Sequence, residues 1–420
     1  MGRSVGSSAR KRPQDDKAKQ SDGGTKKSKL ETSTVTNGEA LSRKKISHVS
    51  HAKIPGCVLA MGEGDTGQLG LGPDIMEKVK PAKVGLPKDN VVQVYAGGMH
   101  TVCLTDAGEV YTFGCNDEGA LGRLTSDEDE CMVPGRVDMT EHIVQISAGD
   151  SHTAFLTDDG RVFACGTFRD ANGPIGLVSG NKIEKTPVEL LPDQVVLKIS
   201  SGTDHLVCLT DKGEIFTLGC ADQGQLGRVT ECFAVRGGRK GIGYLLIPGQ
   251  VHVRKRGAHF CDVWTGQYTT FAQEKNTDII YAWGLNNYYQ LGFADMVNRF
   301  MPSTSTSFDK SLGWTQISGG QHHAIALDKS GDVYTLGRKE YGRLGVGKEN
   351  LEEKSEPCAI KTLQGKKCRM VNAGTAVSFA VLEDGKIYAW GMGSTRQLGQ
   401  SEEDDIYEPQ QVMGKQLEQR

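Results

Sequence analysis

A single motif recurs along most of this chain, and it limits the possible folds more than any other feature. A block written AGGMHTVCLT begins at Ala96, and related blocks follow as AGDSHTAFLT, SGTDHLVCLT, TGQYTTFAQ, SGGQHHAIAL and AGTAVSFAVL. Each is followed by a second block of the type GEVYTFGCNDEGALG, and one more copy of that type, VLAMGEGDTGQLG, precedes the first pair. The closing glycines of the second blocks define seven units, spaced by 51 to 65 residues: Gly70, Gly122, Gly176, Gly227, Gly292, Gly345 and Gly399.

The units are patterned as short strands. Apolar and polar residues alternate over runs of a few residues, and turn pairs such as Asp-Gly interrupt these runs. Repeats of about 50 residues built from short strands are typical of propellers, in which each repeat forms one four-stranded blade. We therefore expect an all-β, seven-bladed β-propeller over residues 55–420.

Comparison of the units separates residues that the scaffold requires from residues that it does not. One position carries a histidine in four units: His100, His152, His205 and His322. A histidine repeated in this way is expected to bond a neighbouring blade. The preceding residue, Asp204, has no acidic counterpart among the residues aligned with it: Met99, Ser151, Tyr268, Gln321 and Ala376. Asp204 is therefore a candidate functional residue, with an exposed turn carboxylate as the structural alternative.

Two units depart from the common length. In the third unit, FRDANGPIG places seven steps between Gly166 and Gly173 where the other units have five, so Asn172-Gly173 is expected to turn a small projecting wedge. The longest interval contains residues 229–260, which hold Arg236, Arg239, Lys240, Arg254, Lys255 and Arg256 against only Glu231. That basic insertion predicts an acidic surface or a polyanion as partner, with a solvated loop as the alternative.

The first 54 residues differ in character from the rest. They carry a net charge of +8, whereas the remainder carries −11. They lack aromatic residues and hydrophobic periodicity, so we expect a disordered basic tail. Two basic clusters resemble a bipartite nuclear import signal, and the same charge favours binding to DNA phosphates: Arg10, Lys11 and Arg12, then Lys26, Lys27 and Lys29. A generic solubilising tail is the alternative.

Composition argues against several other classes of protein. The 11 cysteines are odd in number and never spaced as CxxC, so the sequence predicts neither a disulfide framework nor a zinc site, and favours a reducing compartment. No apolar run approaches a membrane span or a secretory leader. No nucleophile, base and orienting group recur at a spacing suited to a hydrolase. We expect no metal and no cofactor.

Residues 56–420 resemble the family of the regulator of chromosome condensation. The segments that carry the resemblance are AGGMHTVCL, FGCNDEGALGR, AGDSHTA, TLGCADQGQLGRV and SGGQHH. The resemblance implies a nuclear, chromatin-associated propeller that acts as guanine nucleotide exchange factor for the small GTPase Ran. Such a factor releases GDP without making or breaking a covalent bond.

The same resemblance implies a set of site residues. The principal exchange residues would be Asp204 and His322, and further contacts to the GTPase would come from Asp65, Asp150, Arg161 and Arg228. The projecting wedge would comprise Phe168, Arg169, Asp170, Ala171, Asn172, Gly173, Pro174 and Ile175. Arg236, Arg239 and Lys240 would face the acidic patch of the histone dimer in the nucleosome. The family's Asn-Asn-Gly-Val is replaced by Ala171-Asn172-Gly173-Pro174 in this chain, and Ser179 replaces an acidic contact.

The expected organisation is a basic tail over residues 1–54 and a propeller over 55–420. Because no further AG..H block follows, we expect either that the natural chain continues or that the closing blade is short of strands. Expected partners are Ran, the histone acidic patch, nucleosomal DNA through the tail and a nuclear import receptor, with the chain itself a monomer that binds no membrane. The alternative function is a non-catalytic propeller scaffold in the nucleus. A light-sensing propeller requires clustered tryptophans, whereas this chain has only four in all.

Overall fold

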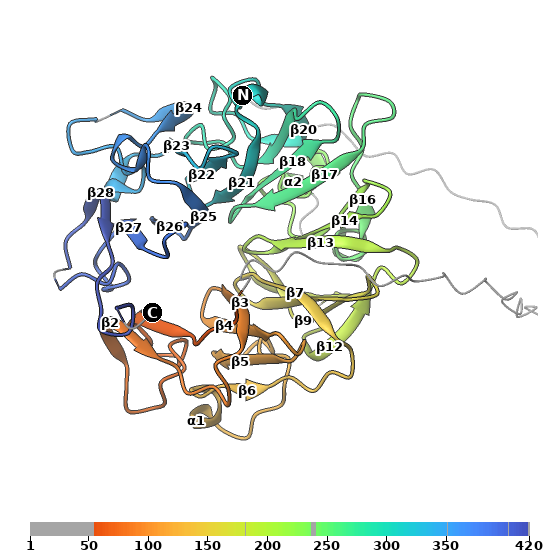
Figure 1. Cartoon of the computed structure of the whole chain (residues 1–420). Coiled ribbons are helices and arrows are strands. Elements are labelled where there is room, and N and C mark those ends of the chain that lie inside the picture. Colours follow the sequence, from red (N-terminus) through yellow and green to blue (C-terminus); the bar gives the residue numbers. More distant parts are fainter. Residues whose placement is uncertain (1–53, 181, 237–240, 351, 402, 419–420) are drawn as a thin grey trace, which may run out of the picture. The chain divides into compact units, whose positions relative to one another are not determined.

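The computed structural model describes residues 54–180, 182–236, 241–350, 352–401 and 403–418. Over these residues the strands form six antiparallel four-stranded sheets, one two-stranded sheet and one small hairpin. Figure 1 shows the sheets following one another around a ring. The prediction of an all-β propeller is confirmed.

The four-stranded sheets are the blades, and they follow one another in chain order. The first three blades are β3 (Val91–Ala96), β4 (His100–Thr105), β5 (Val110–Gly114) and β6 (Gly135–Arg136); β7 (Ile143–Ala148), β8 (His152–Thr157), β9 (Val162–Gly166) and β12 (Glu184–Leu190); and β13 (Val196–Ser201), β14 (His205–Thr210), β15 (Ile215–Gly219) and β16 (Gly249–Gln250). The last three are β17 (Phe260–Thr265), β18 (Thr269–Glu274), β19 (Ile280–Gly284) and β20 (Arg299–Thr304); β21 (Trp314–Gly319), β22 (His323–Asp328), β23 (Val333–Gly337) and β24 (Lys354–Ala359); and β25 (Cys368–Ala373), β26 (Val377–Leu382), β27 (Ile387–Gly391) and β28 (Ile406–Gln411).

The remaining elements are short. The two-stranded sheet pairs β1 (Leu59–Glu63) with β2 (Glu77–Lys83), and the hairpin pairs β10 (Phe168–Asp170) with β11 (Gly173–Gly176). The helices are α1 (Glu128–Cys131), α2 (Glu231–Arg236), α3 (Ile242–Leu246), η2 (Lys310–Leu312), η3 (Glu340–Gly342) and η4 (Lys361–Leu363). We call the sheet β7-β8-β9-β12, from which the hairpin projects, the wedge blade.

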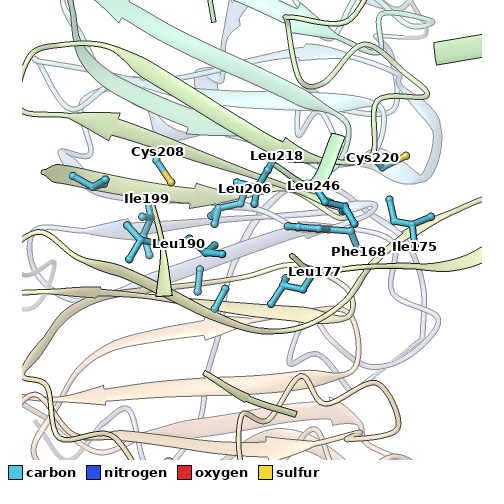
Figure 2. Packing of buried hydrophobic residues seen from close by; sticks show 14 of the residues in the cluster. Phe168, Ile175, Leu177, Leu190, Ile199, Leu206, Cys208, Leu218, Cys220 and Leu246 are labelled. Carbon is cyan, nitrogen blue, oxygen red and sulfur yellow. The ribbon is translucent and has the colours of Figure 1, made fainter. Parts of the chain in front are cut away.

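Stacking of neighbouring blades makes the core. The second strands β8, β14, β18 and β22 are buried along their whole length, because each lies in a sheet covered on both faces. One hydrophobic cluster joins Ala154, Val162 and Leu190 of the wedge blade to Ile199, Leu206 and Leu218 of the next. Figure 2 labels Leu190, Ile199, Leu206 and Leu218 within this cluster. The alternation of apolar and polar residues expected from the sequence therefore produces no alternation of buried and exposed side chains on these four strands.

A chain of backbone hydrogen bonds joins the loops at one rim of the ring. We call these the rim loops: residues 97–99, 149–151, 202–204, 266–268, 320–322 and 374–376, each between the first and second strands of a blade. The residue at one fixed position donates its N–H to a carbonyl of the next loop, from Gly98 to Gly149, Asp150 to Thr203, Thr203 to Gln267, Gln267 to Gly320 and Gln321 to Thr375. All five distances lie between 2.9 and 3.3 Å.

Glycine is required where one rim loop approaches the next. A Cβ built on Gly149 would lie 2.5 Å from the carbonyl oxygen of Gly202, and one on Gly202 would lie 2.6 Å from that of Gly266. Real side chains do not approach backbone this closely, so only glycine permits the contact. The repeated glycine of the motif is therefore a packing requirement.

Two of the four predicted histidines, His100 and His205, bond the following blade as expected, and His323 makes a third bond of this kind in place of the predicted His322. The Nε2 atom of His100 lies 2.8 Å from Thr153 Oγ1, that of His205 lies 3.0 Å from Thr270 Oγ1, and that of His323 lies 2.9 Å from Ser378 Oγ. Each hydroxyl donates its own proton to a loop carbonyl, of Ala120, Gln225 or Arg343, so it accepts the Nε2 proton. The structural interpretation of His205 is confirmed.

The two-stranded sheet lies between the first and last blades. On one side Val58 and Val84 pack with Val91 and Phe113, in a cluster that includes residues of β3 and β5. On the other side Lys80 Nζ donates to the carbonyl of Gly399 at 2.6 Å, and Arg396 Nε lies 2.8 Å from Glu77 Oε1. Counted with the six blades, this sheet gives the seven predicted units, the seventh with two strands among the described residues.

Thr270→Val should lower the free energy of unfolding by about 1–3 kcal/mol, because His205 Nε2–H would lose its acceptor inside the core. Urea unfolding at pH 7 measures the effect. Thr140→Val, at an exposed threonine whose hydroxyl donates to the neighbouring Glu141, serves as the control and should change stability little. Equal stability of the two variants would contradict the structural role of this hydrogen bond.

Candidate functional site

The strand register corrects the sequence alignment by one residue in the fifth blade. His205 pairs with Gly219, and the residue at the same place in the fifth blade is His323, which pairs with Gly337. The alignment of His205 with His322 is therefore wrong, as is that of Asp204 with Gln321. The segment SGGQHH has two adjacent glycines and two adjacent histidines, so two registers fit the sequence equally well.

The corrected register places Asp204 and His322 at the same position of their repeats. Each immediately precedes the first residue of a second strand, and each lies in a rim loop. Because the rim loops are hydrogen bonded in series, both side chains belong to one rim of the ring. This rim is the candidate functional site.

Asp204 is the centre of an acidic group. Its side chain is nearly buried, with a residue exposure of 9%, and its Oδ1 accepts the backbone N–H of Arg169 at 2.7 Å. Burial raises the pKa of Asp204 to about 7, and the neighbouring charge of Asp150 adds to the increase. Burial also raises the pKa of Asp150. Arg169 pairs with a third carboxylate, that of Glu118.

The hairpin β10-β11 is the predicted wedge. Asp170 pairs with Gly173, so Ala171 and Asn172 form the two-residue turn, one residue earlier than expected. The N–H of Asn172 bonds Asp170 Oδ1 at 2.8 Å, and the N–H of Gly176 bonds Thr167 Oγ1 at 3.0 Å. These bonds close both ends of the hairpin.

Two residues assigned to the GTPase surface are in fact the base of the wedge. Phe168 is 0% exposed and Ile175 is 2% exposed, and Figure 2 shows both beside Leu177 and Leu246 in the hydrophobic cluster. They cannot contact a partner without leaving the core. The part of the wedge open to a partner is Arg169, Asp170, Ala171, Asn172, Gly173 and Pro174.

Five of the rim loops and Arg169 of the wedge line a cavity of about 510 Å³. Its lining comes from five of the six four-stranded blades and includes Asp150, Arg169, Tyr268, Gln321 and Thr375. Tyr268 occupies the repeat position of Asp204, and burial raises its pKa. Sequence reasoning did not select Tyr268 or Glu118, although Tyr268 was visible as another unusual residue at that repeat position.

His322 is held in a mixed polar and aromatic setting. Its Nδ1 lies 3.1 Å from Asn287 Oδ1, and its ring centroid lies 5.0 Å from that of Tyr288. Burial, with Arg338 and Arg343 nearby, lowers the pKa of His322 to about 4. The ring is therefore neutral at pH 7 and donates its Nδ1 proton to Asn287.

Of the other predicted contacts, Asp65 lies on the rim and Arg161 does not. Asp65 is exposed in the turn after β1, where Gln68 Oε1 and Nε2 bond the turn residues and Thr101 bonds the Gln68 carbonyl. Arg161 lies in the turn between β8 and β9, at the opposite end of the strands, and pairs with Asp159 and Glu141. Arg161 is therefore not part of this site.

Arg228 is used by the insertion itself. Its guanidinium donates to the carbonyls of Thr217, Tyr244, Leu245 and Ile247 and lies over the Tyr244 ring at 4.8 Å. Arg123, at the same repeat position, likewise bonds carbonyls in its own blade. The repeated arginine anchors the loop that follows it.

The predicted chromatin residues are placed only in part. Arg236 is the last residue of α2, in the connection between β15 and β16. Arg239 and Lys240 lie outside the described residues, as do Arg10, Lys11, Arg12, Lys26, Lys27 and Lys29 of the tail. Across the described ranges no cluster of three or more His, Cys, Asp or Glu side chains is arranged to hold a metal ion. None of the helices that the structure describes is long and apolar enough to cross a membrane.

Comparison with known proteins gives consistent matches. Residues 57–420 match the family model of the RCC1-like domain. The chain is 53% identical to the human regulator of chromosome condensation, covering 90% of this chain and 89% of that protein, and 52% identical to the Xenopus laevis protein, covering 93% and 91%. It is 29% identical to the guanine nucleotide exchange factor SRM1 of Saccharomyces cerevisiae, covering 91% of each.

Two solved structures from yeast share the fold. The crystal structure of Prp20p from Saccharomyces cerevisiae, described with its binding to Gsp1p and histones, has a TM-score of 0.79 at 29% identity, covering 88% of this chain and 90% of that one. The structure of Kap60 bound to yeast RCC1 (Prp20) has a TM-score of 0.78 at 27% identity, covering 91% and 92%.

Asp204→Asn should stabilise the chain at pH 8 and leave its stability nearly unchanged at pH 4. The pKa of Asp204 rises from 3.8 to about 7 on folding, so the folded state binds this proton more tightly and loses stability as the pH rises through that window. Asparagine cannot ionise but can still accept the Arg169 N–H. The difference in unfolding free energy at pH 8 should be on the order of 2 kcal/mol. Urea unfolding from pH 4 to 8 measures it, and a difference independent of pH would contradict the burial of this charge.

Proposed function

The chain belongs to the RCC1-like family, and from that membership we propose that it is a guanine nucleotide exchange factor that releases GDP from the small GTPase Ran. The observation that carries the proposal is identity above 50% to regulators of chromosome condensation over nine tenths of the chain. The acidic rim and the projecting wedge supply a surface suited to this activity.

Exchange requires binding energy rather than covalent chemistry. The factor stabilises the nucleotide-free GTPase, and by linkage the nucleotide weakens the factor's own binding to the same extent. An acceleration of about 10⁴-fold requires about 5.5 kcal/mol of preference for the nucleotide-free state. A few charged contacts and one inserted hairpin can supply a preference of this size.

We propose separate roles for the wedge and the acidic group. The tip of the wedge, Arg169 to Pro174, displaces the loops that hold the nucleotide. The carboxylates of Asp150 and Asp204 oppose the negatively charged phosphates while attracting cationic groups of the GTPase. A cation near Asp204 would lower its pKa and favour the charged form, so binding and ionisation support each other. His322, neutral at pH 7, contributes hydrogen bonding rather than charge.

The partners follow the same family pattern. The yeast structures are described with Gsp1p, histones and Kap60 as binding partners of the yeast protein. We propose that this chain likewise binds Ran, histones and a nuclear import receptor, and that it acts in the nucleus on chromatin. In this proposal Arg236, Arg239 and Lys240 face the acidic patch of the histone dimer. The tail over residues 1–54 carries the import signal and binds nucleosomal DNA, while residues 55–420 form the propeller.

A non-catalytic scaffold is the competing function for a propeller, since this fold alone does not specify activity. The two functions differ in one measurable respect, because a scaffold would bind Ran without changing the rate of GDP release. Release of fluorescent GDP from Ran and from a panel of other small GTPases therefore tests the proposal directly. The proposal fails if the full chain accelerates release from none of them.

Asp204→Ala should reduce the maximal rate of GDP release by about tenfold or more, a loss of at least about 1.4 kcal/mol of transition-state stabilisation. The substitution removes both the charge and the acceptor of the Arg169 N–H, whereas Asp204→Asn removes only the charge. Comparison of the two variants in a fluorescent-GDP assay separates these contributions.

Asp159→Asn is the matched control for Asp204→Ala. Asp159 is a carboxylate of the opposite rim that pairs with Arg161, so its neutralisation should leave release unchanged. If Asp204→Ala releases GDP as fast as the parent chain, the role proposed for Asp204 is wrong.

Deletion of residues 1–54 should weaken binding to nucleosomes and make it less dependent on salt, because fewer counterions are released from DNA. GDP release from free Ran should not change. Binding measured over a range of salt concentrations, with free DNA as a second ligand, tests this. Unchanged nucleosome affinity and salt dependence would exclude a DNA-binding role for the tail.

A further inference from the structure

The histidine of the wedge blade breaks the pattern of its repeat. In the blades of His100, His205 and His323, Nε2 bonds a hydroxyl of the next blade. Among the described residues, Nε2 of His152 has no hydrogen-bond partner. The Nδ1 atom lacks a partner in all four histidines, so the difference lies at Nε2 alone.

The cause is the residue at the acceptor position. Thr153, Thr270 and Ser378 each follow the first residue of a second strand, and the residue at that place after the wedge blade is Leu206. Leu206 is fully buried and has no hydroxyl. A buried polar group without a partner is unfavourable, so its presence calls for a physical explanation.

The fourth and fifth blades show one way in which the repeat accommodates the loss of the hydroxyl. In the fifth blade the acceptor position holds Ala324. In the fourth blade the position of the repeated histidine holds Thr269. The polar ring is thus absent where its acceptor is absent. His152 is the exception, since it is retained opposite an apolar residue.

His152 contacts the base of the wedge instead. Its ring centroid lies 4.6 Å from that of Phe168, with an angle of 58° between the ring planes. Phe168 is the first residue of β10, and it lies in one hydrophobic cluster with Leu206 and Ile175 (Figure 2). The next residue, Arg169, has its N–H fixed by Asp204. Two successive residues of the wedge are therefore fixed, Phe168 by His152 and Arg169 by Asp204.

We propose that His152 is a positioning residue for the wedge, and that Leu206, by withholding a hydroxyl, leaves the imidazole ring free to support Phe168. This inference rests on the proposed exchange function for its consequence but not for its geometry. Burial lowers the pKa of His152 to about 3, so the ring is neutral at pH 7 and acts through packing.

Leu206→Thr is the direct test, because it restores the acceptor found in the other blades. The new hydroxyl should take the Nε2 proton, turn the ring away from Phe168 and loosen the hairpin. In the full chain, amide hydrogen exchange over residues 168–176 should accelerate by about tenfold. The maximal rate of GDP release from Ran should fall by about fivefold or more, with the KM for Ran changed less than about twofold.

Thr153→Val is the matched control. It removes the acceptor of His100 and so creates the same unpaired histidine in a blade that carries no wedge. Its amide exchange over residues 168–176 and its rate of GDP release should match those of the parent chain, even if its thermal stability falls. Thr153 itself lies in the wedge blade, next to His152. Its hydroxyl bonds His100 and Ala120 of the preceding blade, so it faces away from the contact between His152 and Phe168.

His152→Leu gives a second, independent variant in case Leu206→Thr fails to fold. It replaces an unpaired polar ring with an apolar side chain, so a purely structural role predicts equal or higher stability and normal release. The proposal predicts faster amide exchange in the wedge and slower release despite that stability.

The outcomes separate this inference from the proposed function. Wedge amides as protected as in the parent chain, in both Leu206→Thr and His152→Leu, would overturn the positioning role. If the parent chain releases no GDP from Ran yet the wedge amides respond as described, the exchange function fails and the positioning of the wedge by His152 stands.

Discussion

The series of backbone hydrogen bonds between rim loops is the interaction on which the rest of the structure depends. Each bond uses the N–H at one fixed repeat position, and each needs a glycine where the next loop passes within about van der Waals distance. Because backbone groups make these bonds, they leave the side chains at the donor position and at the following position unconstrained. Asp150 and Gln321 occupy the first of these positions, and Asp204, Tyr268 and His322 occupy the second. The repeat thus fixes the position of a functional side chain but not its residue type.

The same division explains which residues a single sequence could identify. The repeat, the all-β propeller, the structural role of His205 and the wedge insertion were all visible as patterns of spacing, and the structure confirms them. Asp204 was visible because it differs from its counterparts. Family membership, on which the assignment of exchange activity depends, was visible in whole segments such as FGCNDEGALGR rather than in any single residue.

Other features could not be predicted because they depend on three-dimensional neighbours. The doubled glycine and histidine of SGGQHH fit two registers, and only the pairing of β22 with β23 distinguishes them. The resemblance assigns Arg161 to the GTPase surface, but strand direction places it at the opposite rim. Phe168 and Ile175 belong to the predicted wedge, yet apolar side chains at the two ends of a hairpin are the ones the core can bury. Arg228 is assigned to the same surface, but its guanidinium donates to carbonyls of the insertion.

The two-stranded sheet joins its neighbours differently from the four-stranded blades. The described four-stranded blades share rim-loop hydrogen bonds, whereas β1-β2 meets the last blade through a lysine-to-carbonyl bond, an arginine–glutamate pair and a small apolar contact. In repeat architectures each unit depends mainly on its nearest neighbours. Lys80 and Gly399 lie 319 residues apart along the chain, so this junction brings together the two ends of the described repeats. Closing the ring therefore requires almost every unit between them to be ordered.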